Sequence, residues 1–108
     1  MFIGRYQPLH DGHIWLFQQK INDGIPVLIC VRDVKPDEKN PWTAEQVVEN
    51  ISTKLKHWID SDMLKVMVLP DIEGVYYGRD VGYKVEQLQA PKEIQEISAT
   101  KIRKEMGI

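Results

Sequence analysis

The sequence contains a single cysteine, Cys30, among its 108 residues. One thiol cannot form an intrachain disulfide, and we therefore expect a protein of the reducing cytoplasm. No run of apolar residues is long enough to cross a bilayer, and no signal peptide is recognisable, so we expect no membrane partner. The sequence also has no repeats, low-complexity segments or linkers.

A strong excess of charge of either sign is missing as well. Fourteen basic residues stand against sixteen acidic ones, which gives a net charge of −2. Such a balance produces no broad positive field, so we expect no binding to nucleic acid. The remaining composition, with 43% hydrophobic and 28% charged residues, is ordinary for a globular protein. At this length we expect one domain over residues 1–108.

Three apolar segments predict buried strands. Residues 1–3 are apolar, and residues 25–31 and 64–69 are almost continuously so, as in a parallel sheet covered on both faces. Cys30, inside the second of these segments, is then a small buried residue and not a nucleophile. A polar loop over residues 32–40 follows this segment.

Two helices are predicted between the strands. In the first, Ile14, Phe17 and Ile21 share one face, and Gly24 is the expected C-cap. The second starts at a capping box formed by Thr43 and Gln46. Its apolar stripe consists of Val47, Ile51, Leu55 and Trp58.

The alternation of strand, helix, strand, helix and strand predicts right-handed parallel crossovers. We therefore expect an α/β fold, a Rossmann-like three-layer sandwich with a parallel sheet. Beyond Pro70 the pattern is less regular, and the Arg79-Asp80 pair is either ligand-facing or a surface salt bridge. An edge strand is predicted over residues 83–88. Ser98 is a good N-cap for a final helix over residues 99–106.

The most informative segment is the loop between the first strand and the first helix. His10 and His13 lie three residues apart at the helix start, so both side chains can face one point. Gly12 between them lets an oxygen-rich ligand approach the backbone. The helix N-terminus favours an anion there, and Arg5 could add a charge-assisted contact. This combination suits a phosphate group.

Two other interpretations of the histidines are open. They could be ordinary surface residues, or ligands of a metal, because HxxH is also a metal-binding spacing. Zinc requires further ligands, and neither Cys30 nor His57 has a partner at ligand spacing. We therefore predict no protein-bound metal site, with phosphate binding about as well supported as a structural role.

Three motifs of the chain resemble the nucleotidylyltransferase superfamily and follow the family's order, and a fourth segment resembles one bacterial subgroup of it. Residues 4–13, GRYQPLHDGH, are similar to its GRFQPxHxGH signature, and residues 97–103, ISATKIR, are similar to its ISSTxIR motif. Residues 40–43, NPWT, resemble a segment of nicotinamide mononucleotide adenylyltransferases. Residues 75–83, VYYGRDVGY, resemble nucleotidyltransferase domains found beside adenylylsulfate kinases. The resemblance thus covers nearly the whole chain and implies the HxGH type of this fold.

The resemblance also implies an activity and its residues. A nucleoside monophosphate, AMP favoured, would pass from a nucleoside triphosphate to a small phosphate-bearing acceptor, with release of pyrophosphate. His10, His13 and Arg103 would be catalytic, and Mg²⁺ would accompany the triphosphate, held mainly by nucleotide and water. The implied nucleotide-binding residues are Gly4, Arg5, Gln7, Gly12, Ser98, Ala99 and Thr100. Ala99 stands where the family has a serine, which removes one hydroxyl.

Several alternatives stay open at this point. CTP could replace ATP, because backbone groups that sequence does not reveal recognise the base in this fold. Arg79 and Asp80 are our candidates for the acceptor site. Either the acceptor is small, or a second subunit of a homo-oligomer or a partner domain completes its pocket. The chain could also be a non-catalytic nucleotide-binding module. An aminoacyl-tRNA synthetase is a poor alternative, because no KMSKS motif is present.

Overall fold

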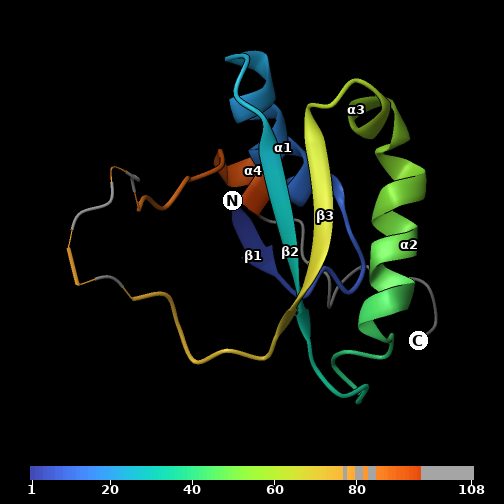
Figure 1. The fold of residues 1–108 in the computed structure, drawn as a ribbon. Coiled ribbons are helices and arrows are strands. Elements are labelled where there is room, and N and C mark those ends of the chain that lie inside the picture. The colour runs from blue at the N-terminus through green and yellow to red at the C-terminus, as the bar shows by residue number, and fades with distance from the viewer. Residues whose placement is uncertain (77, 80–81, 83–84, 96–108) are drawn as a thin grey trace.

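A parallel sheet forms the centre of the computed structural model, which describes residues 1–76, 78–79, 82 and 85–95. In these residues, three strands lie in the order β1 (Phe2–Gly4), β2 (Val27–Asp33) and β3 (Leu64–Pro70) (Figure 1). The central strand, β2, pairs in parallel with both neighbours, so that Ile29 lies opposite Phe2 on one side and Val66 on the other. The predicted parallel sheet with crossover helices is confirmed.

The first helix, α1 (Asp11–Asn22), ends close to the predicted position, but its C-cap is Asp23, and Gly24 is the residue that follows the cap. Gly24 has a φ of +75°, in the left-handed region that glycine tolerates best. Its N–H donates to the Ile21 carbonyl at 2.9 Å, and the Ile25 N–H donates to the Lys20 carbonyl at 3.0 Å. This pair of hydrogen bonds is a Schellman motif and satisfies carbonyls that the helix end would leave unpaired.

The second helix, α2 (Ala44–Lys54), starts at the predicted capping box. The Gln46 N–H donates to Thr43 Oγ1 at 3.2 Å, and the Thr43 N–H donates to Gln46 Oε1 at 2.9 Å. The helix is shorter than its apolar stripe predicts, because Leu55 leaves helical geometry with φ −111° and ψ 25°. A separate short helix, α3 (Lys56–Asp60), then carries Trp58 against the same core.

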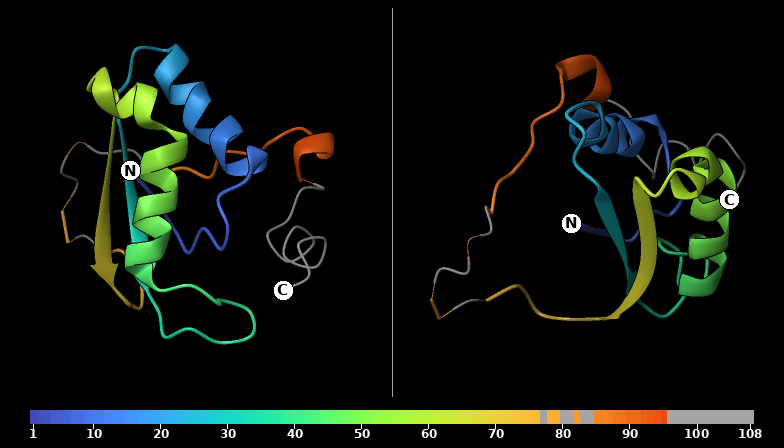
Figure 2. Two further views of the ribbon diagram at one scale, coloured as in Figure 1. Left: turned by 90° about the vertical axis from the view of Figure 1, so that its right-hand side faces the viewer. Right: turned by 45° about the horizontal axis from the view of Figure 1, so that its top comes forward.

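Helices α1 and α2 cover the same face of the sheet (Figure 2). This follows from topology, since two right-handed crossovers that step in the same direction across a sheet place their helices on one side. Phe17 of α1 and Ile51 of α2 are fully buried against Ile29 of the sheet. Between them, these residues form the centre of the core.

The prediction of a three-layer sandwich is not met within the described residues. Ile3 and Met67, which flank Cys30 on the other face of the sheet, are 36% and 44% exposed. No described helix covers that face. The strand order does not reverse in the described part of the sheet. Both crossover helices therefore lie on one face, and the described structure has two layers.

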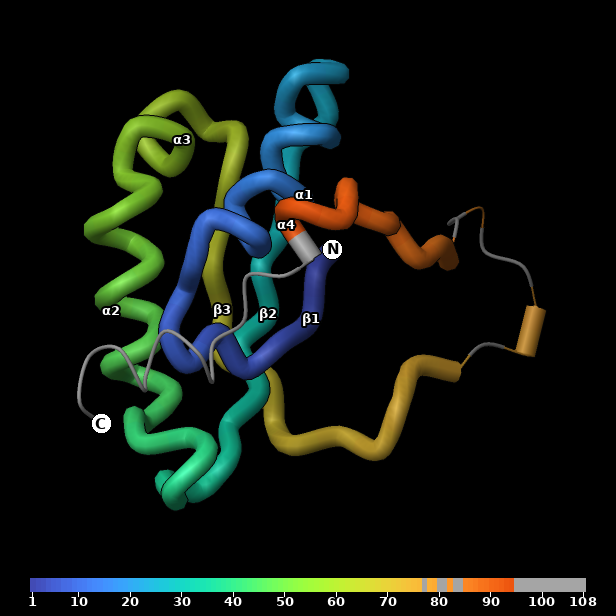
Figure 3. Tube along the Cα trace, turned by 180° about the vertical axis from the view of Figure 1, so that it is seen from behind, coloured from blue at the N-terminus to red at the C-terminus, as the bar shows by residue number. Residues whose placement is uncertain are grey.

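Other predictions also need correction. Strand β3 is an edge strand, so Met67 and Val68 are exposed although their segment is apolar on both faces. Residues 85–88 form no strand, and the rest of the predicted edge strand lies outside the described residues. A four-residue helix, α4 (Lys92–Gln95), follows instead and packs against α1 (Figure 3). The predicted helix over residues 99–106 is outside the described residues.

Within the residues that the structure describes, no helix is both long and apolar enough to span a bilayer.

Candidate functional site

The two histidines form the N-terminal cap of α1. The Gly12 N–H donates to His10 Nδ1 at 3.1 Å, and the His10 N–H donates to His13 Nδ1 at 3.2 Å. His10 thus occupies the N-cap position and His13 the third helical position, as the two partners of a capping box do. Imidazole nitrogens here take the place of the usual hydroxyl and carboxylate.

These hydrogen bonds define the tautomer of both rings. An imidazole nitrogen that accepts a hydrogen bond carries no proton, so in the neutral ring the proton is on the other nitrogen. His10 and His13 are therefore each assigned as the Nε2–H form. Neither Nε2–H group has a hydrogen-bond partner in the part of the chain that the structure describes. Two donors are consequently available to a ligand.

Packing holds the two rings in place. The His10 and His13 rings are stacked, with centroids 3.7 Å apart and planes 17° from parallel. The Tyr6 ring meets His13 edge-on, with a centroid separation of 4.8 Å. Tyr6 is itself only 5% exposed and has a φ of 51°, an unusual backbone conformation for a side chain of this size. The predicted convergence of the two histidines on one point is thus present in the structure.

Burial keeps both imidazoles neutral at pH 7. The pKa of His13 falls from 6.5 to about 3, mainly because of burial and secondarily because a positive charge is unfavourable beside the His10 ring. The pKa of His10 is also below its usual value, because burial outweighs the opposing influence of the Asp11 carboxylate. The site therefore offers a phosphate neutral hydrogen-bond donors, and not imidazolium charges.

Gly12 is required here for a reason that differs from the one expected. A Cβ on Gly12 would lie 2.9 Å from His10 Cε1 and 3.5 Å from the Ile94 carbonyl oxygen of α4. The absent side chain therefore makes room for the His10 ring and for α4. The Gly12 N–H is bonded to His10, so this backbone group is not free for a ligand.

Three other predicted nucleotide-binding residues have identifiable positions. Gln7 is 3% exposed and bonds to the Trp42 backbone through both ends of its amide. A Cβ on Gly4 would lie 3.0 Å from Tyr6 Cζ, so Gly4 accommodates that ring. The Arg5 side chain is exposed. Its charge contributes to the lowered pKa of Asp37, which mainly reflects donation from the Asn40 N–H. The structure gives Gln7 and Gly4 packing roles, and their contact with a nucleotide stays a prediction.

The histidines open into a cavity of about 450 Å³. This cavity, called the histidine pocket below, lies between the start of α1 and the segment that leads into α4. Its lining residues are His10, Gly12, His13, Leu16, Gln87, Leu88, Gln89, Ala90 and Ile94. Nothing in the pattern of residues 87–94 indicates a contact with α1, so the proximity of this segment to the histidines could not be predicted from the sequence.

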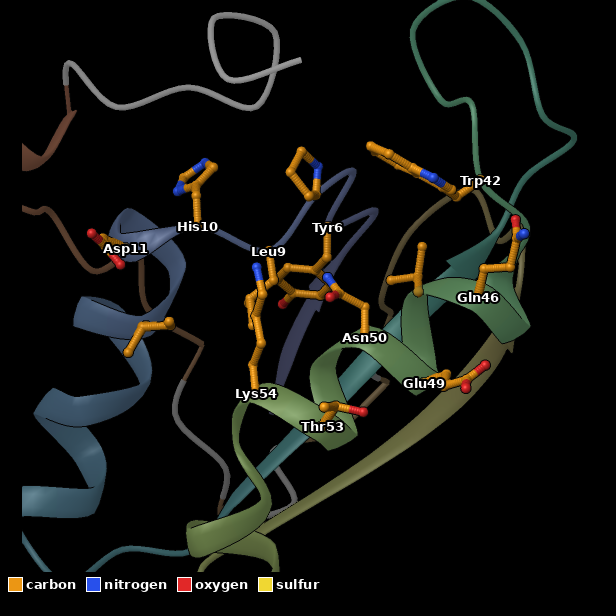
Figure 4. A pocket seen from close by; sticks show the side chains of 13 residues that line it. Tyr6, Leu9, His10, Asp11, Trp42, Gln46, Glu49, Asn50, Thr53 and Lys54 are labelled. Carbon is orange, nitrogen blue, oxygen red and sulfur yellow. The ribbon is translucent and has the colours of Figure 1, made fainter. Parts of the chain in front are cut away.

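A second and larger cavity, of about 900 Å³, lies between the loop after β1 and helix α2 (Figure 4). It is called the α2 groove below. Its lining residues are Tyr6, Pro8, Leu9, His10, Asp11, Ile14, Trp42, Gln46, Val47, Glu49, Asn50, Thr53 and Lys54. His10 therefore borders both cavities, and among the residues that the structure describes it is the only one common to their linings.

The remaining predicted site residues are not brought to these cavities. Arg79 is exposed on the long segment after β3 and lines neither of them. Asp80, Ser98, Ala99, Thr100 and Arg103 lie outside the described residues. Asn50 and Lys54, by contrast, line the α2 groove although sequence reasoning missed them. Gln46, Asn50 and Lys54 follow one another at intervals of four residues, which predicts that they share one face of the helix. A solvent-exposed helix face shows the same spacing, so the pattern alone does not indicate a binding site.

Among the residues that the structure describes, no group of three or more His, Cys, Asp or Glu side chains is arranged to hold a metal ion. When the chain was compared with known protein families, curated proteins and solved structures, no significant match was found in any of the three comparisons.

Proposed function

We propose that the protein transfers a nucleoside monophosphate, AMP favoured, from a nucleoside triphosphate to a small phosphate-bearing acceptor. The observation that carries this proposal is the stacked His10–His13 pair, whose two Nδ1 atoms accept backbone hydrogen bonds. This arrangement supports the proposal because it leaves two fixed Nε2–H donors at the histidine pocket. The resemblance of residues 4–13 and 97–103 to nucleotidylyltransferase motifs supplies the reaction class.

The reaction requires stabilisation of charge and no covalent nucleophile. An acceptor phosphate oxygen attacks the α-phosphorus, a new P–O–P linkage forms, and pyrophosphate leaves with the electron pair of the broken bond. Negative charge develops on the α-phosphate oxygens and on the leaving group. Fixed donors such as the two Nε2–H groups stabilise this charge without having to reorient. Because His10 and His13 are neutral, they act as hydrogen-bond donors and not as proton-transfer groups.

The other half of the triphosphate site is proposed on the resemblance alone. Ser98, Thr100 and Arg103 would contact the β- and γ-phosphates, with Ala99 contributing only its backbone. This segment follows α4 in the chain, and α4 packs against α1. Magnesium would be held mainly by phosphate oxygens and water, in keeping with its preference for oxygen ligands. Bound in this way, the ion would neutralise phosphate charge.

Two alternatives share the same site. A cytidylyltransferase would use CTP, and the histidine pair does not distinguish the bases, since it faces phosphates. A nucleotide-binding module without turnover would keep the same donors. Measurement of pyrophosphate release with ATP and with CTP, each in the presence of a mixture of phosphomonoesters, separates these alternatives.

Histidine variants test the proposal directly. We expect His13→Asn to lower the transfer rate by about 100- to 1,000-fold, the usual loss for one transition-state donor. Asparagine can still accept the His10 N–H, so the helix cap is kept. His57→Ala is the matched control, because His57 is exposed and borders neither cavity. If no triphosphate raises the melting temperature at millimolar concentration, or if His13→Asn and His57→Ala behave alike, the proposal is wrong.

A further inference from the structure

Tyr6 adopts a backbone conformation that is unfavourable for a residue with a large side chain. Its φ of 51° lies in the left-handed region, where the Cβ of an L-residue is crowded by its own backbone. Such a conformation persists only where the surrounding structure determines it, and it is frequent at active sites. The fold therefore holds the Tyr6 ring in one place against the local preference of the chain.

Contacts from three parts of the fold fix this position. In β1, Gly4 leaves space for the ring, since a Cβ there would lie 3.0 Å from Tyr6 Cζ. In α1, the Phe17 ring packs against Tyr6 with centroids 5.8 Å apart. Gln7, the next residue, is bonded through both ends of its amide to the backbone of Trp42, just before α2. Tyr6 is only 5% exposed as a result.

The Tyr6 ring in turn contacts His13. The two rings are nearly perpendicular, at 77°, and their centroids are 4.8 Å apart, an arrangement that aromatic rings favour. His13 also stacks on His10 and accepts the His10 N–H, but both of these contacts are local to the start of α1. Among the ring contacts of the described residues, Tyr6 is the one that joins His13 to the rest of the fold.

Rotation of the imidazole is the motion that this contact restricts. Half a turn about the Cβ–Cγ bond of His13 would exchange Nδ1 with Cδ2 and Nε2 with Cε1. The His10 N–H would then lose its acceptor, and the Nε2–H group would face a different point. A ring packed perpendicular to the imidazole hinders such a rotation, because side chains in a close-packed interior turn only when their neighbours move.

We propose that Tyr6 is a positioning residue for the transfer, whose ring holds His13 with Nδ1 on the helix cap and Nε2–H at the histidine pocket. This inference rests on the proposed nucleotidyl transfer, in which His13 donates to the reacting phosphates. Tyr6 lines the α2 groove, whereas His13 lines the histidine pocket. Tyr6 therefore acts through His13 and does not touch the phosphates itself.

The ring of Tyr6 performs this role, and its hydroxyl does not. The Tyr6 hydroxyl forms no hydrogen bond within the part of the chain that the structure describes. Burial also raises the pKa of Tyr6 well above its usual range, so the hydroxyl stays protonated and transfers no proton. Phenylalanine should therefore replace Tyr6 without loss, whereas an aliphatic side chain lacks the ring that meets His13.

Heteronuclear NMR of the isotope-labelled full chain tests the inference without any ligand, because it distinguishes the two neutral tautomers of each imidazole. The His13→Asn variant identifies the His13 signals, which it lacks. We expect a single Nε2–H tautomer of His13 in the wild type and in Tyr6→Phe. In Tyr6→Leu we expect a mixture of the two tautomers, since the ring that restricts His13 is gone.

Kinetics of pyrophosphate release give a second readout. Tyr6→Leu should lower kcat by about 10- to 100-fold, less than the loss of a donor, because the donor is misplaced and not removed. The KM for the triphosphate should change little, since a fixed donor matters most where charge develops in the transition state. Phe2→Leu is the matched control, because Phe2 belongs to the same aromatic cluster and contacts Phe17, with centroids 5.1 Å apart. It should destabilise the fold but leave kcat and the His13 tautomer unchanged.

Several results would overturn the inference. A single Nε2–H tautomer of His13 in Tyr6→Leu would show that Tyr6 does not position the ring. Equal effects of Tyr6→Leu and Phe2→Leu on kcat and tautomer would reduce Tyr6 to a packing residue, and a defect in Tyr6→Phe would transfer the role to the hydroxyl.

Gly4→Ala decides the question if Tyr6→Leu does not fold. Its new Cβ would lie 3.0 Å from Tyr6 Cζ, so it displaces the ring without removing it. We expect the second His13 tautomer to appear in this variant, and unchanged His13 signals would contradict the inference. If no triphosphate is turned over by the wild type, the proposed transfer is wrong. The spectra of the ligand-free chain would still show whether Tyr6 orients His13.

Discussion

Gln7 and Trp42 are joined by two hydrogen bonds, although 35 residues separate them in the sequence. Gln7 Nε2–H donates to the Trp42 carbonyl at 2.9 Å, and the Trp42 N–H donates to Gln7 Oε1 at 3.0 Å. The side-chain amide of Gln7 thus satisfies both the N–H and the carbonyl group of Trp42, as a backbone partner in a sheet would. It ties the loop that leads to the histidines to the start of α2, and residues of both segments line the α2 groove.

Replacement of Gln7 by leucine should therefore destabilise the protein. We expect a loss of about 1–3 kcal/mol in the free energy of unfolding, because two backbone groups lose their partner. Urea unfolding followed by tryptophan fluorescence measures this loss. Gln18→Leu, at an exposed position of α1, should change the value by no more than about 0.5 kcal/mol. Equal effects of the two substitutions would show that the Gln7 bonds do not stabilise the loop.

Gly12→Ala should lack the stabilisation that this change usually gives inside a helix. Alanine is normally favoured over glycine there by about 1 kcal/mol. In this protein the new Cβ would lie 2.9 Å from the His10 ring, which must move and give up its bond from the Gly12 N–H. We expect no net gain in the free energy of unfolding, together with weaker triphosphate binding. A gain of the usual size with unchanged nucleotide binding would contradict this role of Gly12.

Stability should depend on pH through His13. Its pKa falls from 6.5, the usual value for histidine, to about 3 in the folded protein, so between these values the unfolded chain binds the proton more readily. The free energy of unfolding is then highest above pH 6.5 and falls as the pH drops toward 3. The slope from this residue is at most about 1.4 kcal/mol per pH unit.

Comparison of the wild type with His13→Asn isolates this contribution, since carboxylate groups titrate in both proteins. Melting curves recorded across the same pH window should show a shallower fall in stability for the variant. Parallel pH profiles for the two proteins would mean that the His13 imidazole is readily protonated in the folded state.

The Cys30 thiol should be inert while the protein is folded. It is fully buried at the centre of β2, and burial raises the pKa of the thiol above its usual value, which disfavours the reactive thiolate. A thiol reagent such as Ellman's reagent should therefore modify Cys30 only at the rate at which the chain opens, and rapidly in urea. Immediate modification of the native protein would show that the uncovered face of the sheet gives access to the sulfur.

The sequence predicted most of the framework because its signals are local. The Thr43–Gln46 capping box and the Gly24 helix end involve residues within a few positions of one another, and both are confirmed. Residues 27–31 of the apolar run that contains Cys30 are buried or half-buried as expected, because the central strand of a parallel sheet is apolar on both faces. Ile25, which was predicted to belong to the same strand, precedes β2 and is 47% exposed. Met67 has a sequence environment similar to that of Cys30 but is exposed, since its strand lies at the edge of the sheet. Only tertiary structure distinguishes Met67 from Cys30.

The candidate site was predictable only in part for the same reason. The convergence of His10 and His13 follows from their spacing at a helix start. The use of their Nδ1 atoms as cap acceptors does not, because histidine is an unusual N-cap residue. Lys54 lines the α2 groove only because α2 packs beside the loop after β1, and this is a contact between segments that are distant in the sequence. Sequence patterns carry little information on such contacts.

The central position of β2 also has a consequence for the order in which the protein folds. Neither β1 nor β3 has any other strand partner among the described residues, so neither can join the sheet before residues 27–33 are in place. The Gln7–Trp42 bonds close a loop of 35 residues that contains all of α1 and β2. Closing such a loop costs entropy before its contacts form. We therefore expect the loop after β1, which leads to the two histidines, to become ordered after the sheet. The loop that leads to His10 and His13 would then be among the last described segments to acquire its shape during folding.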